Sequence, residues 1–339
     1  MELNLIIILG NECNFSCLYC YIGDKHIVNS RSINFDKIKE TVFDKVLLFD
    51  SINIEFSGEI NQHLDFIEVL INSLKEKYKI KTFQFFFQLN GSEISKQTVE
   101  FIKRYTINIG LSSDGNKLIN DKTRKFKNQN GAGKIIENAI TTLQNNNIHF
   151  SIRCTITKYN YKTVEQLLQT FNDNRPSSVF LNRLIYKNNA IDNYAEIAIS
   201  FDEYWGFYNE YNMKAIEMDA LNLVDNNLKR WIYRFNNNPK GWLHSCSTNF
   251  CSNIFVLTND SEYQCPKFIE SEVISKAKLD EYRILNCENC ETLQYCNGGC
   301  PLGNNYAKNG LSDECMFVNN IYQLYQDNVT LMNKLIKTN

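Results

Sequence analysis

The sequence lacks a strong charge of either sign. Its 339 residues include 36 lysine and arginine residues against 38 aspartate and glutamate residues, which gives a formal net charge of -2. A protein that binds nucleic acid or an anionic membrane surface through its charge shows a clear basic excess. The charge balance therefore argues against both of these classes.

The sequence also lacks a hydrophobic run long enough to span a membrane. The apolar run near the N-terminus covers only residues 5–9, and Glu2 precedes it. A membrane-spanning helix needs about 20 apolar residues, and a secretory signal peptide begins with basic residues. We therefore expect a cytoplasmic protein whose first strand begins almost at the N-terminus.

Cysteine is too sparse for a disulfide scaffold, but most of it is clustered. The chain has 12 cysteines among its 339 residues. This fraction is well below the roughly 8–10% of cysteine in short secreted disulfide-rich proteins. Three lie in residues 13–20, eight in residues 246–315, and Cys154 stands alone. In a reducing compartment, clustered thiolates hold metal more often than they form disulfides. The four histidines are scattered and have no spacing typical of a zinc site.

Short apolar runs alternate with amphipathic stretches from about residue 4 to residue 186, which predicts βα units and a parallel sheet. Six strands favour a partial (β/α)6 barrel of the TIM type, because a complete eightfold barrel usually takes about 250 residues. Barrel chemistry takes place at the carboxyl ends of the strands. The expected strands are 5–9, 52–56, 83–89, 107–111, 150–156 and 179–185, and the expected helices are 35–48, 64–78, 95–104, 135–144 and 163–171.

The rest of the chain predicts further parts. Residues 201–235 are helical and aromatic in pattern, and turn-forming residues at 236–241 predict a linker. The cysteine-rich segment follows, and the chain ends in a helix at 319–337. We therefore expect an α/β fold with the partial barrel in residues 1–195, a helical bridge in 196–240, a small α+β domain in 241–325 and a C-terminal helix in 326–339.

The first cysteine group predicts a reactive iron–sulfur cluster. Cys13, Cys17 and Cys20 directly follow the first expected strand. One tight loop can wrap three thiolates around a four-iron cluster, and one iron then has no thiolate ligand. An open coordination position is typical of a reactive metal centre. A zinc site with three cysteines is the alternative.

This loop resembles that of the radical S-adenosylmethionine (SAM) enzymes. The resemblance implies that the open iron binds SAM, and that one electron cleaves SAM to a 5'-deoxyadenosyl radical, which takes a hydrogen atom from the substrate. The segment Ser57-Gly58-Glu59 is similar to the Gly-Gly-Glu-Pro motif of the family, although only Gly58 and Glu59 match it. It implies that the Ser57 carbonyl and the Glu59 carboxylate face the SAM ammonium group.

Residues 111–115, followed by Asp121 and Arg124, are similar to the signature Ser-Leu-Asp-Gly-Pro...His-Asp-x-x-Arg of the peptide-modifying branch. The resemblance implies that Ser112 and Arg124 hold SAM, since an arginine can fork onto a carboxylate.

The signature is incomplete. Ser113, Asn116 and Asn120 stand where that branch has leucine, proline and histidine. Asp114 fits a helix cap or a turn equally well, and Asp121 fits an ordinary salt bridge.

The eight C-terminal cysteines have the dense spacing of a metal-binding module. Eight thiolates suffice for two fully ligated four-iron clusters, and equally for two zinc sites. The segment resembles the SPASM domain of radical SAM peptide maturases, which implies an iron–sulfur domain for electron transfer and three 4Fe-4S clusters in all. The resemblance assigns Cys246, Cys251, Cys265 and Cys300 to an inner auxiliary cluster, and Cys287, Cys290, Cys296 and Cys315 to an outer one.

Two single positions bear on the reaction. In the anaerobic sulfatase-maturing enzymes, an aspartate at the place of Pro266 takes a proton from the substrate, and a proline cannot do so.

Cys154 lies on the fifth expected strand. If it faced into the barrel, it would donate a hydrogen atom to a substrate radical, as a peptide epimerase requires. Strand alternation gives that orientation even odds, and we favour a buried apolar role for this thiol.

The sequence therefore predicts a radical SAM enzyme that matures a ribosomally made precursor peptide. An oxidative cross-link such as a thioether is the expected product. The alternatives are a peptide epimerase, a side-chain oxidase of the sulfatase-maturing type, and a non-catalytic iron–sulfur or zinc-binding redox adaptor. The expected partners are the precursor peptide and an electron donor such as flavodoxin or ferredoxin. Since the cysteine loop begins at residue 13, either a separate protein or the enzyme itself is expected to bind the leader peptide.

Overall fold

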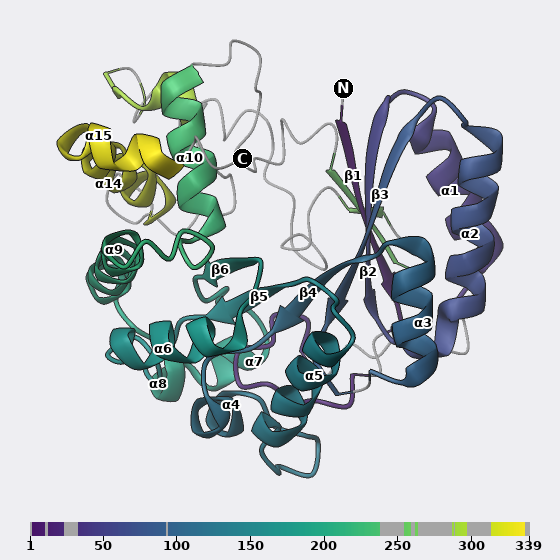
Figure 1. Ribbon diagram of the computed structural model, residues 1–339, viewed down its shortest axis with the longest axis horizontal. Helices are drawn as coiled ribbons and strands as arrows, with labels where there is room; N and C mark the ends of the chain where they lie inside the picture. Colours follow the sequence, from purple (N-terminus) through teal and green to yellow (C-terminus); the bar gives the residue numbers. More distant parts are fainter. Residues whose placement is uncertain are drawn as a thin grey trace. The chain divides into compact units, whose positions relative to one another are not determined.

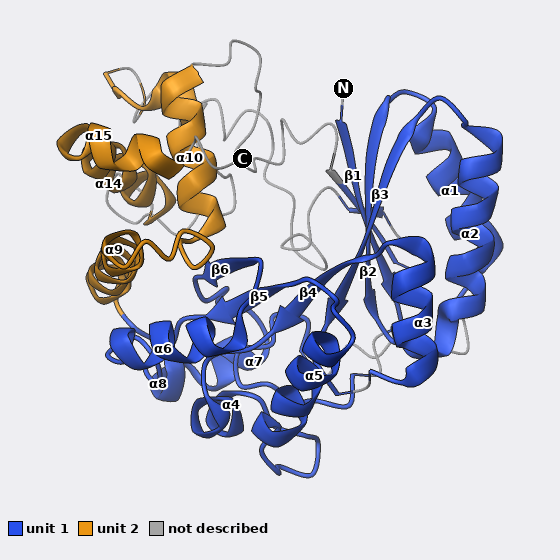
Figure 2. Cartoon of the chain, in the orientation of Figure 1, with its two compact units in different colours: residues 1–199, 253–263 blue, residues 200–252, 264–339 orange. Residues whose placement is uncertain are grey.

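The computed structural model describes residues 2–10, 13–23, 33–92, 94–237, 254–258, 262–263, 287, 289–296 and 313–335. The chain divides into two compact units, one of residues 1–199 with 253–263 and one of residues 200–252 with 264–339 (Figure 2). The finer division into four parts stays a prediction.

The first unit is an α/β fold built on a parallel sheet, as the alternation of apolar runs predicted. All six expected strands are present, and neighbours in the sequence are neighbours in the sheet (Figure 1). They therefore form the sheet of a partial barrel. The strands are β1 (Glu2–Leu9), β2 (Ser51–Gly58), β3 (Thr82–Leu89), β4 (Asn108–Ser112), β5 (Phe150–Thr155) and β6 (Ser178–Asn182).

Amphipathic helices connect these strands and lie on one side of the sheet (Figure 1). In α1, for example, Ile38, Val42 and Val46 recur at a spacing of four and are buried. Helix α4 and the short helices after β6 were not expected. The elements are α1 (Phe35–Val46), η2 (Ile60–His63), α2 (Leu64–Lys77), α3 (Lys96–Tyr105), α4 (Lys117–Thr123), α5 (Gly133–Asn145), α6 (Val164–Asn174), α7 (Asn189–Asp192) and α8 (Tyr194–Ile197).

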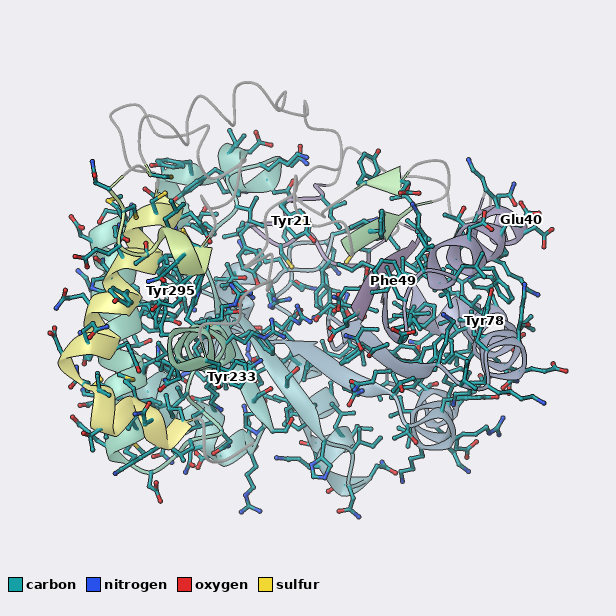
Figure 3. All side chains as sticks on the ribbon, turned by 90° about the horizontal axis from the view of Figure 1, so that it is seen from above. Tyr21, Glu40, Phe49, Tyr78, Tyr233 and Tyr295 are labelled. Carbon is teal, nitrogen blue, oxygen red and sulfur yellow. The ribbon has the colours of Figure 1, made fainter. Side chains whose placement is uncertain are left out.

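The two faces of the sheet differ in chemistry. In β5, Phe150, Ile152 and Cys154 are buried, whereas the alternating residues Arg153 and Thr155 are only half-buried. The other strands repeat this alternation, which follows from the two-residue period of a strand. We call the half-buried side, which carries Arg153, the inner face. The opposite face packs against helices, and aromatic pairs such as Phe43 and Tyr78 extend this packing between the helices (Figure 3).

A short hairpin extends the sheet beyond β1. Strand β7 (Ile254–Leu257) pairs in parallel with β1, and β8 (Glu262–Tyr263) pairs with β7 in antiparallel orientation. Lys45 on α1 bridges to Glu262 at 2.6 Å. The sequence analysis assigned these residues to the cysteine-rich part, but their backbone pairing joins them to the sheet of the first unit.

The second unit contains the aromatic helices that the sequence predicted. Phe317 packs against Tyr208 at 4.9 Å between ring centres, and Phe235 packs against Tyr295 at 5.0 Å. These contacts explain why the segment is rich in aromatic residues. Its elements are α9 (Phe201–Glu217), α10 (Asn226–Asn237), α12 (Leu293–Cys296), α14 (Asp313–Asp327), α15 (Val329–Met332) and η4 (Asn333–Leu335).

In the part of the chain that the structure describes, no helix combines the length and the apolar character that a membrane crossing requires.

Candidate active site

The cysteine loop, residues 13–20, follows β1 at the carboxyl end of the sheet. The backbone of the segment after α4 holds it: Ser16 donates to the carbonyl of Lys125 at 2.7 Å, and Phe15 forms a β-bridge with Phe126. The rings of Phe15 and Phe126 meet edge to face, with 4.8 Å between their centres. The loop is thus fixed by residues about 110 positions away in the sequence, which local patterns do not reveal.

Two of the three thiols in this loop accept hydrogen bonds from the backbone. Phe15 N–H donates to Cys13 Sγ, and Gly23 N–H donates to Cys20 Sγ, each at 3.4 Å. Asn90 at the end of β3 adds a side-chain N–H to Cys13 Sγ at 3.5 Å. Hydrogen bonds to sulfur are a feature of iron–sulfur sites, where they tune the reduction potential.

The pKa of the Cys17 thiol is raised to about 12. Burial is the largest cause, Arg124 opposes it, and the nearby Cys20 and Cys13 add to it. A coordinated metal reverses this preference, because a ligating thiol loses its proton. Thiolates are the ligands that iron–sulfur clusters use, so the three side chains are of the right chemical type. Among the described residues, no three histidine, cysteine, aspartate or glutamate side chains are gathered closely enough to hold a metal ion, so the ligand assignment stays a proposal.

The candidate SAM motif lies beside this loop. Gly58 ends β2 and is paired in register with Leu9 at the end of β1. Its φ is +91°, and a Cβ there would stand 2.5 Å from the Leu9 carbonyl oxygen and 2.7 Å from that of Gly10. Glu59 N–H donates to the Leu9 carbonyl at 2.8 Å. Only glycine therefore fits this close approach.

Replacing Gly58 with alanine is expected to lower the free energy of unfolding by about 1–3 kcal/mol, because the new methyl group meets backbone oxygens in a left-handed conformation. Urea unfolding measures this loss. Gly206→Ala on α9 is the matched control, since an added Cβ there meets no atom within 4 Å. The control is expected to gain about 0.5–1 kcal/mol, and equal stability of the two variants would contradict the strain.

A fully buried aspartate, Asp114, ties the site together just after β4. Its Oδ2 accepts from Tyr19 OH at 2.5 Å, Thr123 Oγ1 at 2.7 Å and Arg124 Nε at 3.1 Å. Its Oδ1 accepts from Thr155 N–H at 2.9 Å. These five residues, which we call the Asp114 network, connect the cysteine loop, the end of α4 and the end of β5.

Asp114 is not a helix cap, which corrects one interpretation of the sequence. Asn116 caps α4 instead, by accepting from Ile119 N–H at 3.1 Å. Asn120, which departs from the family signature, accepts from Asp114 N–H at 2.8 Å. Asp121 is a salt-bridge partner as expected, and it pairs with Lys117 on the surface of α4.

Arg124 is a buried guanidinium paired with a carboxylate. It is 5% exposed. Burial is the largest influence and lowers the pKa of the guanidinium, but Asp114, Tyr19, Cys17 and Cys154 together more than offset it and raise the pKa above its usual value. The guanidinium carbon also lies 5.4 Å from the ring centre of Tyr19. Burial raises the pKa of the Tyr19 hydroxyl well above its normal value, so it stays a hydrogen-bond donor. Arg124 uses only Nε toward Asp114, and its Nη groups carry four further donors.

Ser112 and Cys154 have different surroundings. Ser112 Oγ, at the end of β4, accepts from Gln88 Nε2 at 3.0 Å on the inner face. Cys154 is fully buried on the opposite face of β5, and Asn160 Nδ2 lies 3.6 Å from its Sγ. This placement is typical of a buried small residue, which is the role that we favoured from the sequence.

Of the C-terminal cysteines, the structure describes Cys287, Cys290, Cys296 and Cys315. The first and third are buried, and the Cys290 thiol lies 3.2 Å from Thr292 Oγ1. Thr292 in turn donates to Asn319 Oδ1 at 2.6 Å. The other predicted ligands, together with Pro266, lie outside the described residues: Cys246, Cys251, Cys265 and Cys300.

Known proteins resemble this arrangement. Residues 7–171 match the radical SAM superfamily. A cysteine-type anaerobic sulfatase-maturating enzyme of Clostridium novyi is 24% identical over 97% of this chain and 96% of its own length. An uncharacterised Methanocaldococcus jannaschii protein is 29% identical, over 49% of this chain and 57% of its own length. The chain thus spans just over half the length of this second relative.

A solved structure has the same fold across the whole chain. It is anSMEcpe with bound AdoMet and the Kp18Cys peptide, with a TM-score of 0.77, 19% sequence identity, and coverage of 99% of this chain and 100% of that one. The matched residues 7–171 include the cysteine loop, Gly58, Asp114 and Arg124. This chain therefore carries a radical SAM domain in residues 7–171.

Proposed function

We propose that this enzyme matures a peptide or protein substrate by forming an oxidative cross-link, such as a thioether. The observation that carries the proposal is the Asp114 network, because it places the cysteine loop and the buried guanidinium of Arg124 around one point at the carboxyl edge of the sheet. Support for a peptide substrate comes from the relatives, one named as sulfatase-maturating and one solved with a bound peptide.

Each predicted residue has a defined task in this proposal. Cys13, Cys17 and Cys20 would hold the iron–sulfur cluster, which with bound SAM supplies the 5'-deoxyadenosyl radical. Arg124, fixed by Asp114, offers its Nη donors to the SAM carboxylate. Further SAM contacts are assigned to residues at the carboxyl ends of β2 and β4: Ser57, Gly58, Glu59 and Ser112.

The cross-link fixes the balance of hydrogens and electrons. A closed ring contains two hydrogens fewer than the open peptide: one leaves as an atom to the 5'-deoxyadenosyl radical, and the other leaves as a proton and an electron. Accepting that electron is the chemistry that two auxiliary 4Fe-4S clusters would supply. We assign them to the eight C-terminal cysteines, which makes three clusters in all.

Side-chain oxidation of the sulfatase-maturing type is the second candidate, and the Clostridium novyi relative favours it. Pro266 argues against it, because a proline offers no base at the position where those enzymes have an aspartate. We further propose a cytoplasmic enzyme that receives electrons from a flavodoxin or ferredoxin. The leader peptide is proposed to bind either to a separate partner protein or to the enzyme itself.

Anaerobic reconstitution with iron and sulfide tests the cofactor assignment. About twelve irons per chain are expected, because three clusters each hold four, and dithionite with SAM should release 5'-deoxyadenosine. Few irons, stoichiometric zinc and no SAM cleavage would show a metal-binding adaptor instead.

The product assay separates the candidate reactions. The reconstituted enzyme is incubated with SAM, dithionite and equal-length peptides that each contain one cysteine, and the products are fragmented by mass spectrometry. A cross-link removes two hydrogens and joins the cysteine to a second residue, whereas side-chain oxidation changes the cysteine alone. An epimerase would leave the mass unchanged in water and add deuterium in heavy water.

A further inference from the structure

An ion pair crosses the inner face of the sheet. Arg153 on β5 reaches Glu55 on β2, with 2.9 Å between Nη2 and Oε2, although β3 and β4 lie between these strands. Gly110 on β4 makes this reach possible: a Cβ there would stand 3.2 Å from Arg153 Nε and 2.5 Å from Gln88 Oε1. The guanidinium therefore lies across a position that has no side chain.

The pair is accessible from the inner side. The Arg153 side chain is 37% exposed and that of Glu55 is 22% exposed. The ring centre of Phe180 on β6 lies 5.2 Å from the guanidinium carbon. An arginine can stack on such a ring and still offer hydrogen bonds at its edge.

The pair also stands next to the proposed SAM site. Arg153 is paired in register with Ser112, the last residue of β4. Gln88 Nε2 donates to Ser112 Oγ. Gln88 therefore contacts the SAM-binding edge through its amide nitrogen and the Gly110 position through its amide oxygen. A substrate segment that lay along the inner face next to the proposed SAM site would therefore lie beside this pair.

Charge on this face is otherwise rare. By strand alternation, the inner-face residues of β1–β6 include only one further charged side chain, Glu2. It lies at the opposite, N-terminal end of β1, where Asn53 donates to it at 2.8 Å. At the carboxyl half of the inner face, Arg153 and Glu55 thus supply one charge of each sign, and their sum is zero.

A purely structural brace would satisfy its own polar atoms. Among the described residues, Arg153 Nε and Gln88 Oε1 are both buried and have no hydrogen-bond partner. An unmet buried polar atom costs about 1–3 kcal/mol. Within the described part of the chain, Arg153 Nε is thus a donor without an acceptor, and Gln88 Oε1 is an acceptor without a donor, and both lie near Gly110 beside an accessible guanidinium. This arrangement points to a role in ligand recognition rather than in stability alone.

We propose that Arg153 and Glu55 determine substrate specificity by charge, which rests on the proposed peptide-modifying function. As a neutral pair they favour an uncharged peptide segment next to SAM. A charged segment is attracted by one member of the pair and repelled by the other, so it gains no net attraction that would offset its own desolvation in this half-buried site.

The test compares three probe peptides that are identical except beside a single cysteine, where they carry glutamate, glutamine or lysine. The conversion of each peptide is divided by the conversion of the glutamine peptide in the same enzyme preparation, so the amount of active enzyme cancels. The native enzyme is expected to favour glutamine. Glu55→Gln should shift the ratio about tenfold toward the glutamate peptide, and Arg153→Gln about tenfold toward the lysine peptide.

Two further variants separate charge selection from general damage. The double variant Glu55→Gln/Arg153→Gln has no net charge at the site, so it should return to the native preference. Arg104→Gln removes the arginine of a pair on the helical layer, Arg104–Glu68 at 3.3 Å, and should leave the ratios unchanged. A merely structural pair would change the overall rates of the single variants but not their ratios.

The outcomes also distinguish this inference from the proposed function. If the native enzyme cleaves SAM but alters none of the three peptides or the wider cysteine library, the peptide-modifying function itself fails. If it converts peptides but both single variants keep the native charge ratios, the inference alone is overturned. Opposite shifts in the two single variants would establish it.

Discussion

Alanine in place of Cys17 is expected to abolish the release of 5'-deoxyadenosine from SAM. The loop offers only three thiols, so the proposed cluster has no spare protein ligand. Burial raises the pKa of the Cys17 thiol to about 12, and a thiol that binds a metal ion loses its proton. The loss of this cluster should lower the iron content from about twelve to about eight per chain.

The measurement is an iron count together with chromatography of the nucleoside product under dithionite. Cys154→Ala is the matched control, because it removes one thiol that is fully buried on the opposite face of β5. That control should keep both the iron and the SAM cleavage. Native-like SAM cleavage by Cys17→Ala would contradict the assignment of the loop, whatever the state of the C-terminal cysteines.

The fold of the first unit was predictable because its signals are local. Each strand is a short apolar run and each long helix an amphipathic stretch, and chain order alone fixes the neighbours of a parallel sheet. Helix α4 was missed because it has only seven residues, too few for a clear helical period. The pairing of β7 with β1 joins residues about 250 positions apart, and no periodic pattern encodes such a contact.

The candidate site was predictable in its motifs but not in its connections. Gly58 and Arg124 were found because they recur at fixed places in family motifs. The role of Asp114 was missed because its partners Tyr19 and Thr155 lie 95 and 41 positions away. One signal was present: an acidic residue directly after a strand end, ten positions before an arginine. This pattern indicates a buried ion pair only when the strand is known to end in the interior of the protein.

The face of the sheet on which a strand residue lies could likewise not be predicted from the sequence alone. Alternation divides β5 into two sets, but it does not say which set packs against the helices. The structure places Cys154 with the helix-facing set and Arg153 on the inner face. The residue of β5 that we propose to meet a substrate is therefore the arginine, and the buried position of the neighbouring thiol agrees with the role that we favoured from the sequence.

Asparagine in place of Asp114 is expected to cause the largest loss of stability in the first unit. The substitution keeps the shape of the side chain but removes its charge, so the buried Arg124 loses its counter-ion. Breaking a buried ion pair by removing one partner costs about 3–5 kcal/mol. One oxygen of the native side chain also accepts from three donors, and an amide cannot match all four native acceptor contacts.

Urea unfolding and SAM binding to the reconstituted enzyme measure the two consequences of Asp114→Asn. Arg124 should no longer be fixed toward the SAM carboxylate, so the affinity for SAM should fall at least tenfold in the folded fraction, a loss of about 1.4 kcal/mol. Asp121→Asn is the matched control. The Asp121 carboxylate is half-buried, pairs with Lys117 and accepts from Gly133 N–H, and the amide oxygen of asparagine can keep the latter contact, so the substitution should cost far less. If both variants were equally stable and bound SAM equally well, the Asp114 network would not organise the site, since a fully buried charge and a half-buried one would then be interchangeable.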